Sequence, residues 1–186
     1  MILAFLRAEY HSPRFKALIR RALGGNADLL HRPRLDDAAE NRARKAALAA
    51  VRGYGNNEYL FRGFPSDVEW TLVSLTRDEL GDLLYANYPT WVELSGGTRA
   101  IRDGAKNVDL INVREEANTN IRAVVREVAS GRQYPPLIFA GECSTTGLVL
   151  VEGHTRATAY FLEMPEGAEI EVIVGSSGAM RSWAFY

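Results

Sequence analysis

The sequence of 186 residues has a single cysteine, Cys143. One thiol cannot form an intrachain disulfide, so we expect a reducing compartment and predict a cytoplasmic protein. His11 and His31 show no metal-ligand spacing, and no Cys/His cluster is present, which argues against a zinc site.

Long apolar runs are also missing. None approaches the ~20 residues that span a bilayer, which excludes a transmembrane helix. The segment Met1–Arg7 has no charged n-region, and its apolar run is too short for a signal peptide. We therefore expect no membrane association.

Net charge is nearly absent, at −1, and gives no overall attraction to nucleic acid. The distribution is uneven, because residues 1–60 hold 11 Lys and Arg against 6 Asp and Glu, and residues 61–186 hold 11 against 17. A basic N-terminal face suits a polyanion, although solvated helix faces have the same composition. With 47% hydrophobic and 24% charged residues, the chain has the composition of a globular protein of one domain, or one domain with an extension.

Capping residues predict the helices of the N-terminal part. Ser12 followed by Pro13 predicts a helix that ends at Gly24 and Gly25. Asp37 with Glu40 is a capping box that predicts a second helix, over residues 38–52.

The middle of the chain combines two predicted strands with a short helix. Residues 68–75 read as a strand, and Thr76 with Glu79 caps a helix that ends by Tyr88, before Pro89. The run at residues 91–94 predicts another strand, which leads into a glycine-rich turn at residues 95–99.

Strands and helices alternate most clearly in the last third. A strand is expected at residues 108–111, and apolar spacing predicts a helix over residues 121–128 that ends at Gly131. The remaining predictions are strands at residues 137–140 and 148–151, a helix at 154–163 and a strand at 169–174.

The turn from Glu152 to Arg156 lies where a buried strand changes to an apolar helix. The first N–H groups of a helix have no partner within it, and the helix dipole is positive there, so a phosphate is the expected ligand. Gly153 allows close approach of the backbone, and His154, Thr155 and Arg156 add side-chain donors.

The order of elements over residues 107–175 resembles the ParB/sulfiredoxin superfamily. The turn Glu152-Gly153-His154-Thr155-Arg156 is similar to the Asp-Gly-His-(His/Thr)-Arg signature of its ADP- or ATP-dependent free serine kinases, with Glu for Asp. Those kinases carry a catalytic glutamate nearly forty residues earlier, and Glu115 lies 37 residues before Glu152.

This resemblance implies phosphoryl transfer from ATP or ADP. Glu115 would be the base that accepts the hydroxyl proton, with Glu116 as the other candidate and an acceptor-binding residue otherwise. His154 and Arg156 would counter the developing charge, and Glu152 would hold Mg²⁺, a cation that prefers carboxylate oxygens. The cofactor-binding residues would be Glu152, Gly153, His154, Thr155 and Arg156.

Each assignment has a structural alternative. Arg156 is either a phosphate ligand or the partner of Glu152 in an ion pair, and His154 is either a site residue or a helix-terminus residue. Glu115 and Glu116 also suit a solvated first turn of a helix. The acceptor pocket is assigned to Trp91, Ser95, Thr98 and Arg99, which also suit an aromatic core position and an ordinary turn.

Taken together, the sequence predicts an α/β (α+β) protein. Residues 1–105 form a mainly helical extension with one or two strands, and residues 106–186 form a ParB/sulfiredoxin-like nucleotide-binding domain with a small mixed sheet. The expected function is nucleotide-dependent phosphorylation of a hydroxyl on a small metabolite such as serine, a sugar or a nucleoside. The alternatives are a ParB-like nucleic-acid-binding or nuclease module and a non-catalytic nucleotide-binding regulator.

Overall fold

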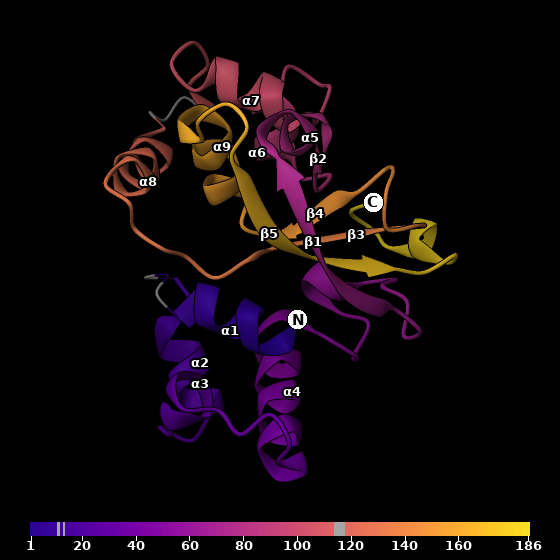
Figure 1. The fold of residues 1–186 in the computed structure, drawn as a ribbon. Helices are drawn as coiled ribbons and strands as arrows, with labels where there is room; N and C mark the ends of the chain where they lie inside the picture. The colour runs from indigo at the N-terminus through magenta and orange to yellow at the C-terminus, as the bar shows by residue number, and fades with distance from the viewer. Residues whose placement is uncertain (11, 13, 114–117) are drawn as a thin grey trace. The chain divides into compact units, whose positions relative to one another are not determined.

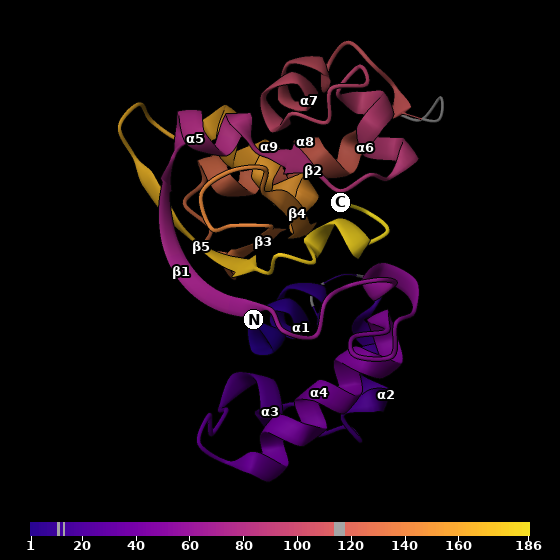
Figure 2. The same ribbon diagram turned by 90° about the vertical axis from the view of Figure 1, so that its right-hand side faces the viewer.

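The computed structural model describes residues 1–10, 12, 14–113 and 118–186, which form two compact units (Figures 1 and 2). Unit 1 comprises residues 1–66 and 182–184, and unit 2 comprises residues 67–181, 185 and 186. The sequence placed a division between residues 105 and 106. The structure instead places residues 67–105 with the C-terminal sheet, because β1 (Glu69–Thr76) pairs with β5 (Glu169–Ser176).

Unit 1 is helical in the part of the chain that the structure describes. Its core contains apolar side chains from several helices, among them Phe5, Ile19 and Leu48. The helices are α1 (Ile2–Tyr10), α2 (Lys16–Ala22), α3 (Asp28–His31), α4 (Ala38–Arg52) and the short 3-10 helix η1 (Tyr59–Phe61). Of these, α1, α3 and η1 were not predicted from the sequence.

Helix α4 has the predicted bounds. The Asp37 carboxylate accepts the N–H groups of Ala39 and Glu40 at 2.8 and 3.0 Å, and Gly53 ends the helix at φ 82°. The second half of the predicted capping box is wrong, because the Glu40 carboxylate accepts the Arg34 N–H at 2.9 Å and not that of Asp37. The helix predicted to begin after Ser12 corresponds to α2, which begins later, at Lys16. Pro13, the predicted first residue of that helix, lies outside the described residues.

Unit 2 is built on a five-stranded mixed sheet in the order β1-β5-β3-β4-β2, which confirms the predicted α/β class. Strand β5 lies antiparallel to β1 and parallel to β3, whereas β3 is antiparallel to β4 and β4 is parallel to β2. The remaining strands are β2 (Leu84–Tyr85), β3 (Leu137–Gly141) and β4 (Val149–Glu152).

Helices cover the face of the sheet that carries Phe139, Val172 and Val174 (Figure 1). Ala157 of α9 and Leu80 of α5 are buried against these strands. The helices of unit 2 are α5 (Arg77–Asp82), α6 (Pro89–Leu94), α7 (Ile101–Asn107), α8 (Thr119–Ala129) and α9 (His154–Glu163), followed later by the 3-10 helix η3 (Met180–Ser182).

Two predicted strands are wrong. Residues 91–94 belong to α6, which Pro89 starts at its first position and which places Trp91 and Leu94 on one side, toward the core. Residues 108–111 form a turn in which the Asn107 carbonyl accepts the N–H groups of Leu110 and Ile111. Runs of four residues with three apolar side chains fit a strand and a turn of helix equally well, so only tertiary contacts decided them.

The helix predicted to end by Tyr88 is shorter. Thr76 and Glu79 form the expected capping box, but α5 ends at Asp82. Leu84 then donates its N–H to the Leu148 carbonyl at 3.0 Å, which starts β2. Among the described residues no helix is both long and apolar enough to cross a membrane.

Candidate functional site

The junction between β4 and α9 requires a glycine. Gly153 has φ 105°, a conformation that L side chains rarely adopt. A Cβ atom there would lie 2.6 Å from Leu137 Cδ2 and 2.9 Å from Arg156 Nη2. The sequence therefore places glycine where the chain is left-handed and where a guanidinium packs against the backbone.

Arg156 and Glu152 are bound to each other at this junction. Their side chains are 8% and 13% exposed, and Arg156 Nη2 forms an ion pair with the Glu152 carboxylate. Arg156 Nη1 donates to the Pro135 carbonyl, and the guanidinium carbon lies 5.9 Å from the centre of the Tyr134 ring. Of the two possibilities left by the sequence, the structure shows the ion pair.

The backbone at the start of α9 has unused donors. The Ala157 N–H makes the first helical hydrogen bond, to the Gly153 carbonyl at 2.7 Å. The N–H groups of Thr155 and Arg156 have no acceptor among the residues that the structure describes. Gly153 has no side chain to cap them, so the positive end of a ten-residue helix retains two donors.

His154 lies in an aromatic cluster. Its ring centre is 5.1 Å from that of Trp91 and 5.9 Å from that of Tyr85, with interplanar angles of 28° and 15°. His154 Nε2 accepts the Ala86 N–H at 3.2 Å. The imidazole is therefore held between the aromatic rings and the backbone that follows β2.

Tyr85 connects this cluster to α9 by hydrogen bonds. It is fully buried, and burial raises the pKa of its phenol well above the usual range. Its hydroxyl lies 2.7 Å from Thr158 Oγ1, which in turn donates to the His154 carbonyl at 2.9 Å. These bonds fix the first turn of α9 to β2.

The loop assigned to acceptor binding is held by its own hydrogen bonds. Ser95 is 1% exposed, and its hydroxyl donates to the Trp91 carbonyl at 2.8 Å and accepts the Arg99 N–H at 2.9 Å. Thr98 Oγ1 donates to Asp103 Oδ2 at 2.8 Å. The hydroxyl groups of Ser95 and Thr98 therefore stabilise an ordinary turn, which was the structural alternative to acceptor binding.

Arg99 serves the same structural purpose. Its guanidinium donates to the carbonyl oxygens of Tyr85, Tyr186 and Phe185 at 2.9, 3.1 and 3.3 Å. Of the four residues assigned to an acceptor pocket, only Trp91 lies in direct contact with the α9 junction, through His154.

Of the proposed base and the proposed metal ligand, the structure describes only the second. Glu115 and Glu116 lie outside the described residues. Glu152 is described, but its carboxylate is bound by Arg156, and no group of three or more His, Cys, Asp or Glu side chains in the described ranges could hold a metal ion. The Mg²⁺ role expected for Glu152 does not fit this arrangement.

The chain matches no protein-family model, no curated protein and no solved structure. Its site must therefore be judged on its own geometry.

Two features of this region were not found from the sequence. Tyr85 and the Ala86 N–H were missed, although the apolar run Leu83–Ala86 before Pro89 was a usable signal for a buried strand. Cys143 also has an unexpected environment, since hydrogen bonds from Thr146 and Thr145 lower the pKa of its exposed thiol to about 6. No sequence pattern indicated that effect.

Proposed function

We propose that the start of α9 binds the phosphate of a nucleotide and that the protein transfers a phosphoryl group to the hydroxyl of a small metabolite. One observation carries the binding part: the N–H groups of Thr155 and Arg156 have no acceptor in the described chain and lie at the positive end of a helix without a side-chain cap. The transfer part depends on the resemblance of the turn to the free serine kinases.

The structure changes the roles proposed for the side chains. Arg156 is a positioning residue, because its guanidinium holds Glu152 and the Pro135 carbonyl and thereby shapes the turn. Thr155 is half-buried and is the side chain next to the two amides that could donate a hydroxyl hydrogen bond to phosphate. No step through a protein-held Mg²⁺ is proposed, since the Glu152 carboxylate is already engaged.

Thermal melting tests the binding part. ADP, ATP or CTP should raise the melting temperature, because a ligand that prefers the native state stabilises it. Thr155→Asp should abolish this shift, since a carboxylate beside the amides repels phosphate, while it leaves α9 folded or slightly more stable. Thr155→Asn, a neutral side chain of the same size, is the control and should retain binding. If none of the three nucleotides moves the transition of the unaltered protein, the phosphate site is refuted.

Turnover tests the transfer part separately. Glu115→Gln should abolish phosphoryl transfer and leave the nucleotide-induced melting shift intact, because an amide cannot accept the hydroxyl proton. A protein that binds nucleotide but never consumes it, with serine, a sugar or a nucleoside offered, would instead be a non-catalytic regulator.

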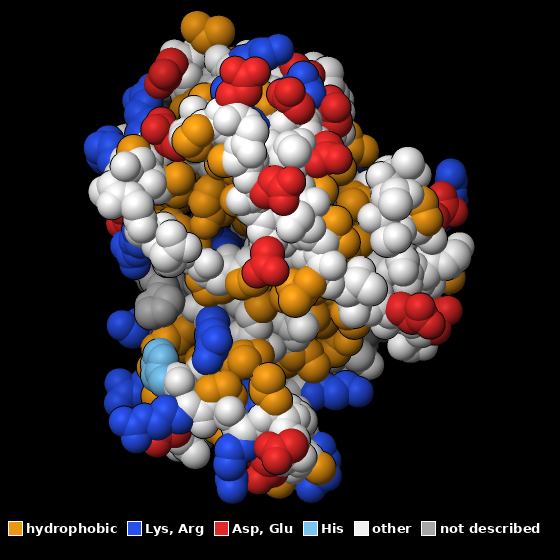
Figure 3. All heavy atoms as spheres, viewed as in Figure 1, with side chains coloured by type: hydrophobic (Ala, Val, Ile, Leu, Met, Phe, Trp, Pro, Cys, Tyr) orange, Lys and Arg blue, Asp and Glu red, His pale blue; other side chains and the backbone are white. Residues whose placement is uncertain are grey.

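Unit 1 supports a second candidate, binding to nucleic acid. Residues 1–66 contain 12 Lys and Arg against 6 Asp and Glu. Figure 3 shows basic side chains gathered over the N-terminal helices on this face. Exposed Lys16, Arg20 and Arg21 of α2 line an open hollow of about 690 Å³. A salt titration of DNA binding tests this candidate, because phosphate contacts release counterions.

A further inference from the structure

Strand β1 forms one edge of the sheet in unit 2. It pairs with β5 over eight consecutive residues, and no other strand of the described chain pairs with its outer side (Figures 1 and 2). The opposite edge is much shorter, because β2 has two residues, and Leu84 also forms a bridge with Ala100. Backbone groups along a long unpaired edge are a template for pairing with another strand.

The backbone groups on the outer side of β1 include those of Leu72 and Ser74. The Ser177 N–H donates to the Gly141 carbonyl at 3.1 Å, so the odd-numbered residues of β5 bond toward β3 and the even-numbered residues bond toward β1. The residue of β5 opposite Val73 is even-numbered, so Val73 bonds inward and its two neighbours direct their N–H and C=O groups outward. The N–H and C=O groups of Leu72 and Ser74 have no partner among the residues that the structure describes.

This edge lacks the features that usually keep edge strands from pairing. Natural edges are protected by lysine, proline or a bulge. Residues 69–76 contain no lysine or proline, and their register with β5 is continuous. Leu72, in the middle of the strand, is 64% exposed. A second strand at this edge would remove that apolar side chain from water.

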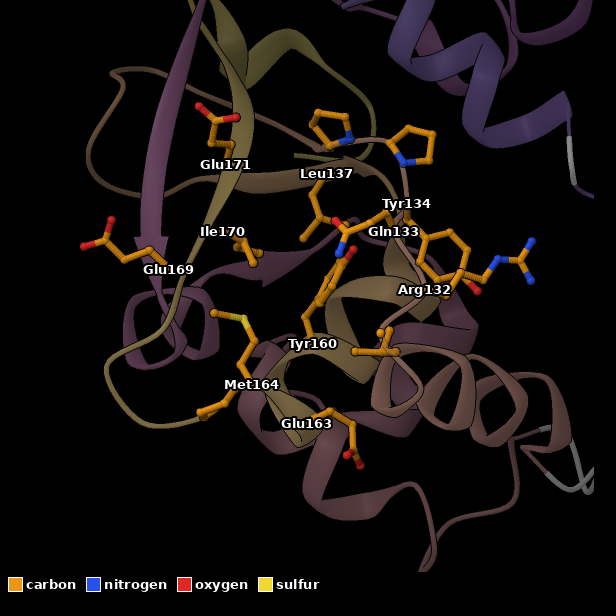
Figure 4. Close-up of a pocket in the computed structure, with 15 residues that line it drawn as sticks. Arg132, Gln133, Tyr134, Leu137, Tyr160, Glu163, Met164, Glu169, Ile170 and Glu171 are labelled. Atoms are coloured by element: carbon orange, nitrogen blue, oxygen red, sulfur yellow. The ribbon is translucent and has the colours of Figure 1, made fainter. Parts of the chain in front are cut away.

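The two faces of β1 follow those of β5. Figure 4 shows Ile170 of β5 turned toward the apolar side chains of the core and Glu171 turned away from them. Leu75 is the partner of Ile170, and Ser74 is the partner of Glu171. Leu72 therefore lies with Ser74 on the face of the sheet opposite to α5 and α9.

The edge is complementary to itself in an antiparallel register. A twofold axis at Val73 places Leu72 of one copy opposite the partner's Ser74, and Ser74 opposite the partner's Leu72. This pairing joins the N–H and C=O groups of both residues in main-chain hydrogen bonds. Val73 then lies directly opposite the partner's Val73, and β-branched pairs of this kind stabilise antiparallel strands.

The charges that flank the strand fit the same register. Glu69 and Arg77 lie four residues before and four residues after Val73, so a twofold axis there brings each Glu69 beside the partner's Arg77. Neither side chain forms an ion pair with a residue that the structure describes. Arg77 Nε donates to the Phe161 carbonyl at 2.7 Å, which leaves the terminal nitrogens for a carboxylate. An exposed pair adds little affinity, but it favours this register over others.

We propose that the edge of β1 binds the same edge of a second copy of the chain, so that two five-stranded sheets join across a twofold axis at Val73. The two exposed Leu72 side chains are diagonal neighbours across this axis and pack on each other. Eight residues a side is below the ~20–30 of a standard interface, so association at micromolar concentrations is expected. The residues at the start of α9 take no part in it.

Sedimentation velocity of the full chain at a series of concentrations tests the proposal. The fraction of dimer should rise with concentration. Leu72→Lys should weaken association about tenfold or more, because it places two like charges near the axis and a lysine on the edge. Leu110→Lys is the matched control, since Leu110 is 79% exposed in the turn at residues 108–111, and association should be unchanged.

A chain that stays monomeric at every concentration would leave the edge to a strand of another protein and overturn the proposal. Equal losses in the two lysine variants would overturn it as well, because they would show a general effect of charge. The melting shift caused by nucleotides should be the same in both variants and in the unaltered protein, so this claim and the phosphate claim fail separately.

Disulfide cross-linking tests the register. In a Cys143→Ser background, Val73→Cys should give a covalent dimer under mild oxidation, because directly opposed residues at such a position have Cα atoms about 4.5 Å apart, within disulfide range. Thr71→Cys lies on the same face and is the control. Its two copies would lie roughly 13 Å apart along the paired strands, so it should form little dimer. Linking of Thr71→Cys as efficient as that of Val73→Cys would overturn the proposed axis.

Discussion

Gly153 shows how one residue sets the shape of the α9 junction. Gly153→Ala forces a Cβ atom onto Leu137 Cδ2 and Arg156 Nη2 and keeps an unfavourable φ of 105°. We expect a loss of about 2 kcal/mol in the free energy of unfolding, and weaker nucleotide binding because the ion pair of Arg156 must move. Chemical denaturation with and without nucleotide measures both effects.

Gly97→Ala is the control that separates backbone strain from steric contact of the added Cβ atom. Gly97 has φ 94°, but a Cβ atom there would meet no atom within 4 Å. This variant should lose about 1 kcal/mol through backbone strain alone and bind nucleotide normally. Equal losses at the two glycines would mean that the crowding at Gly153 is unimportant.

Cys143 gives a prediction for pH at the same scale. Its Sγ lies 3.2 Å from Thr146 Oγ1, and hydrogen bonds from Thr146 and then Thr145 lower the thiol pKa from 9.0 to about 6. Because the folded-state pKa is depressed, the thiolate predominates above pH 6, and alkylation by iodoacetamide should be near its maximum at neutral pH.

Thr146→Val tests the cause of that shift. The substitution keeps the shape of the side chain and removes the hydroxyl donor, so the midpoint of the pH–rate profile should rise toward the ordinary thiol value. Cys143 is the only cysteine in the sequence, so the alkylation rate reports on it alone. An unchanged midpoint would assign the reactivity to another feature of the loop.

At the scale of elements, one buried arginine joins the helices of unit 1. Arg44 is 2% exposed and donates to the carbonyl oxygens of Leu29 and Arg34 at 3.0 Å and to the carboxylate of Glu40 at 3.0 Å. It therefore connects α3, the segment before α4 and α4 itself.

Arg44→Met should destabilise unit 1 by about 3 kcal/mol, because two carbonyl groups each lose a hydrogen bond and Glu40 loses its buried ion-pair partner. Hydrogen exchange of the α4 amides measures the effect within unit 1. Arg42→Met, at an exposed position of the same helix, should change the same exchange by less than about 0.5 kcal/mol. Comparable effects at both positions would indicate that helix propensity, and not the buried network, is being measured.

The sequence predicted elements whose ends carry local chemical signals. Helix α4 has the Asp37 cap and Gly53, and α9 follows a glycine after a buried strand, so their bounds were clear. Short elements depended on partners distant in sequence: β2 exists because Leu84 meets Leu148, and α6 because Trp91 packs on His154. The local signals, an apolar run at Leu83–Ala86 and Pro89 at the start of α6, do not by themselves decide between strand and helix.

For the candidate site, the position of the turn could be predicted from the sequence, but the contacts of its side chains could not. The position of the turn at residues 152–156 followed from the strand-to-helix change, and the presence of a glycine there agrees with its φ. The direction of the Arg156 side chain did not follow, because an arginine four residues after a glutamate can bind either that carboxylate or an external anion. The structure decides this through the Pro135 carbonyl, which comes from a different segment.

At the scale of the whole chain, the two units carry opposite charge. Unit 1 has 12 Lys and Arg against 6 Asp and Glu, whereas unit 2 has 10 against 17. The net charge near zero is therefore the sum of a positive unit and a negative unit. At physiological salt each charge acts over a Debye length of about 8 Å, so a ligand responds to the local charge of the unit that it approaches. A polyanion is expected to bind unit 1 in preference to unit 2.

DNA binding by unit 1 should accordingly depend on α2. The triple variant Lys16→Gln/Arg20→Gln/Arg21→Gln removes three exposed cations, so the slope of log affinity against log salt should decrease in magnitude by about 2 to 3. Fluorescence anisotropy with a short labelled duplex over a salt series measures this slope. Arg122→Gln/Arg132→Gln removes two arginines of unit 2 that pair with Asp109 and Glu127, and should leave the slope unchanged. If the triple variant binds DNA with the original slope, the basic face of α2 does not contact phosphate, and its charge serves only to keep unit 1 solvated.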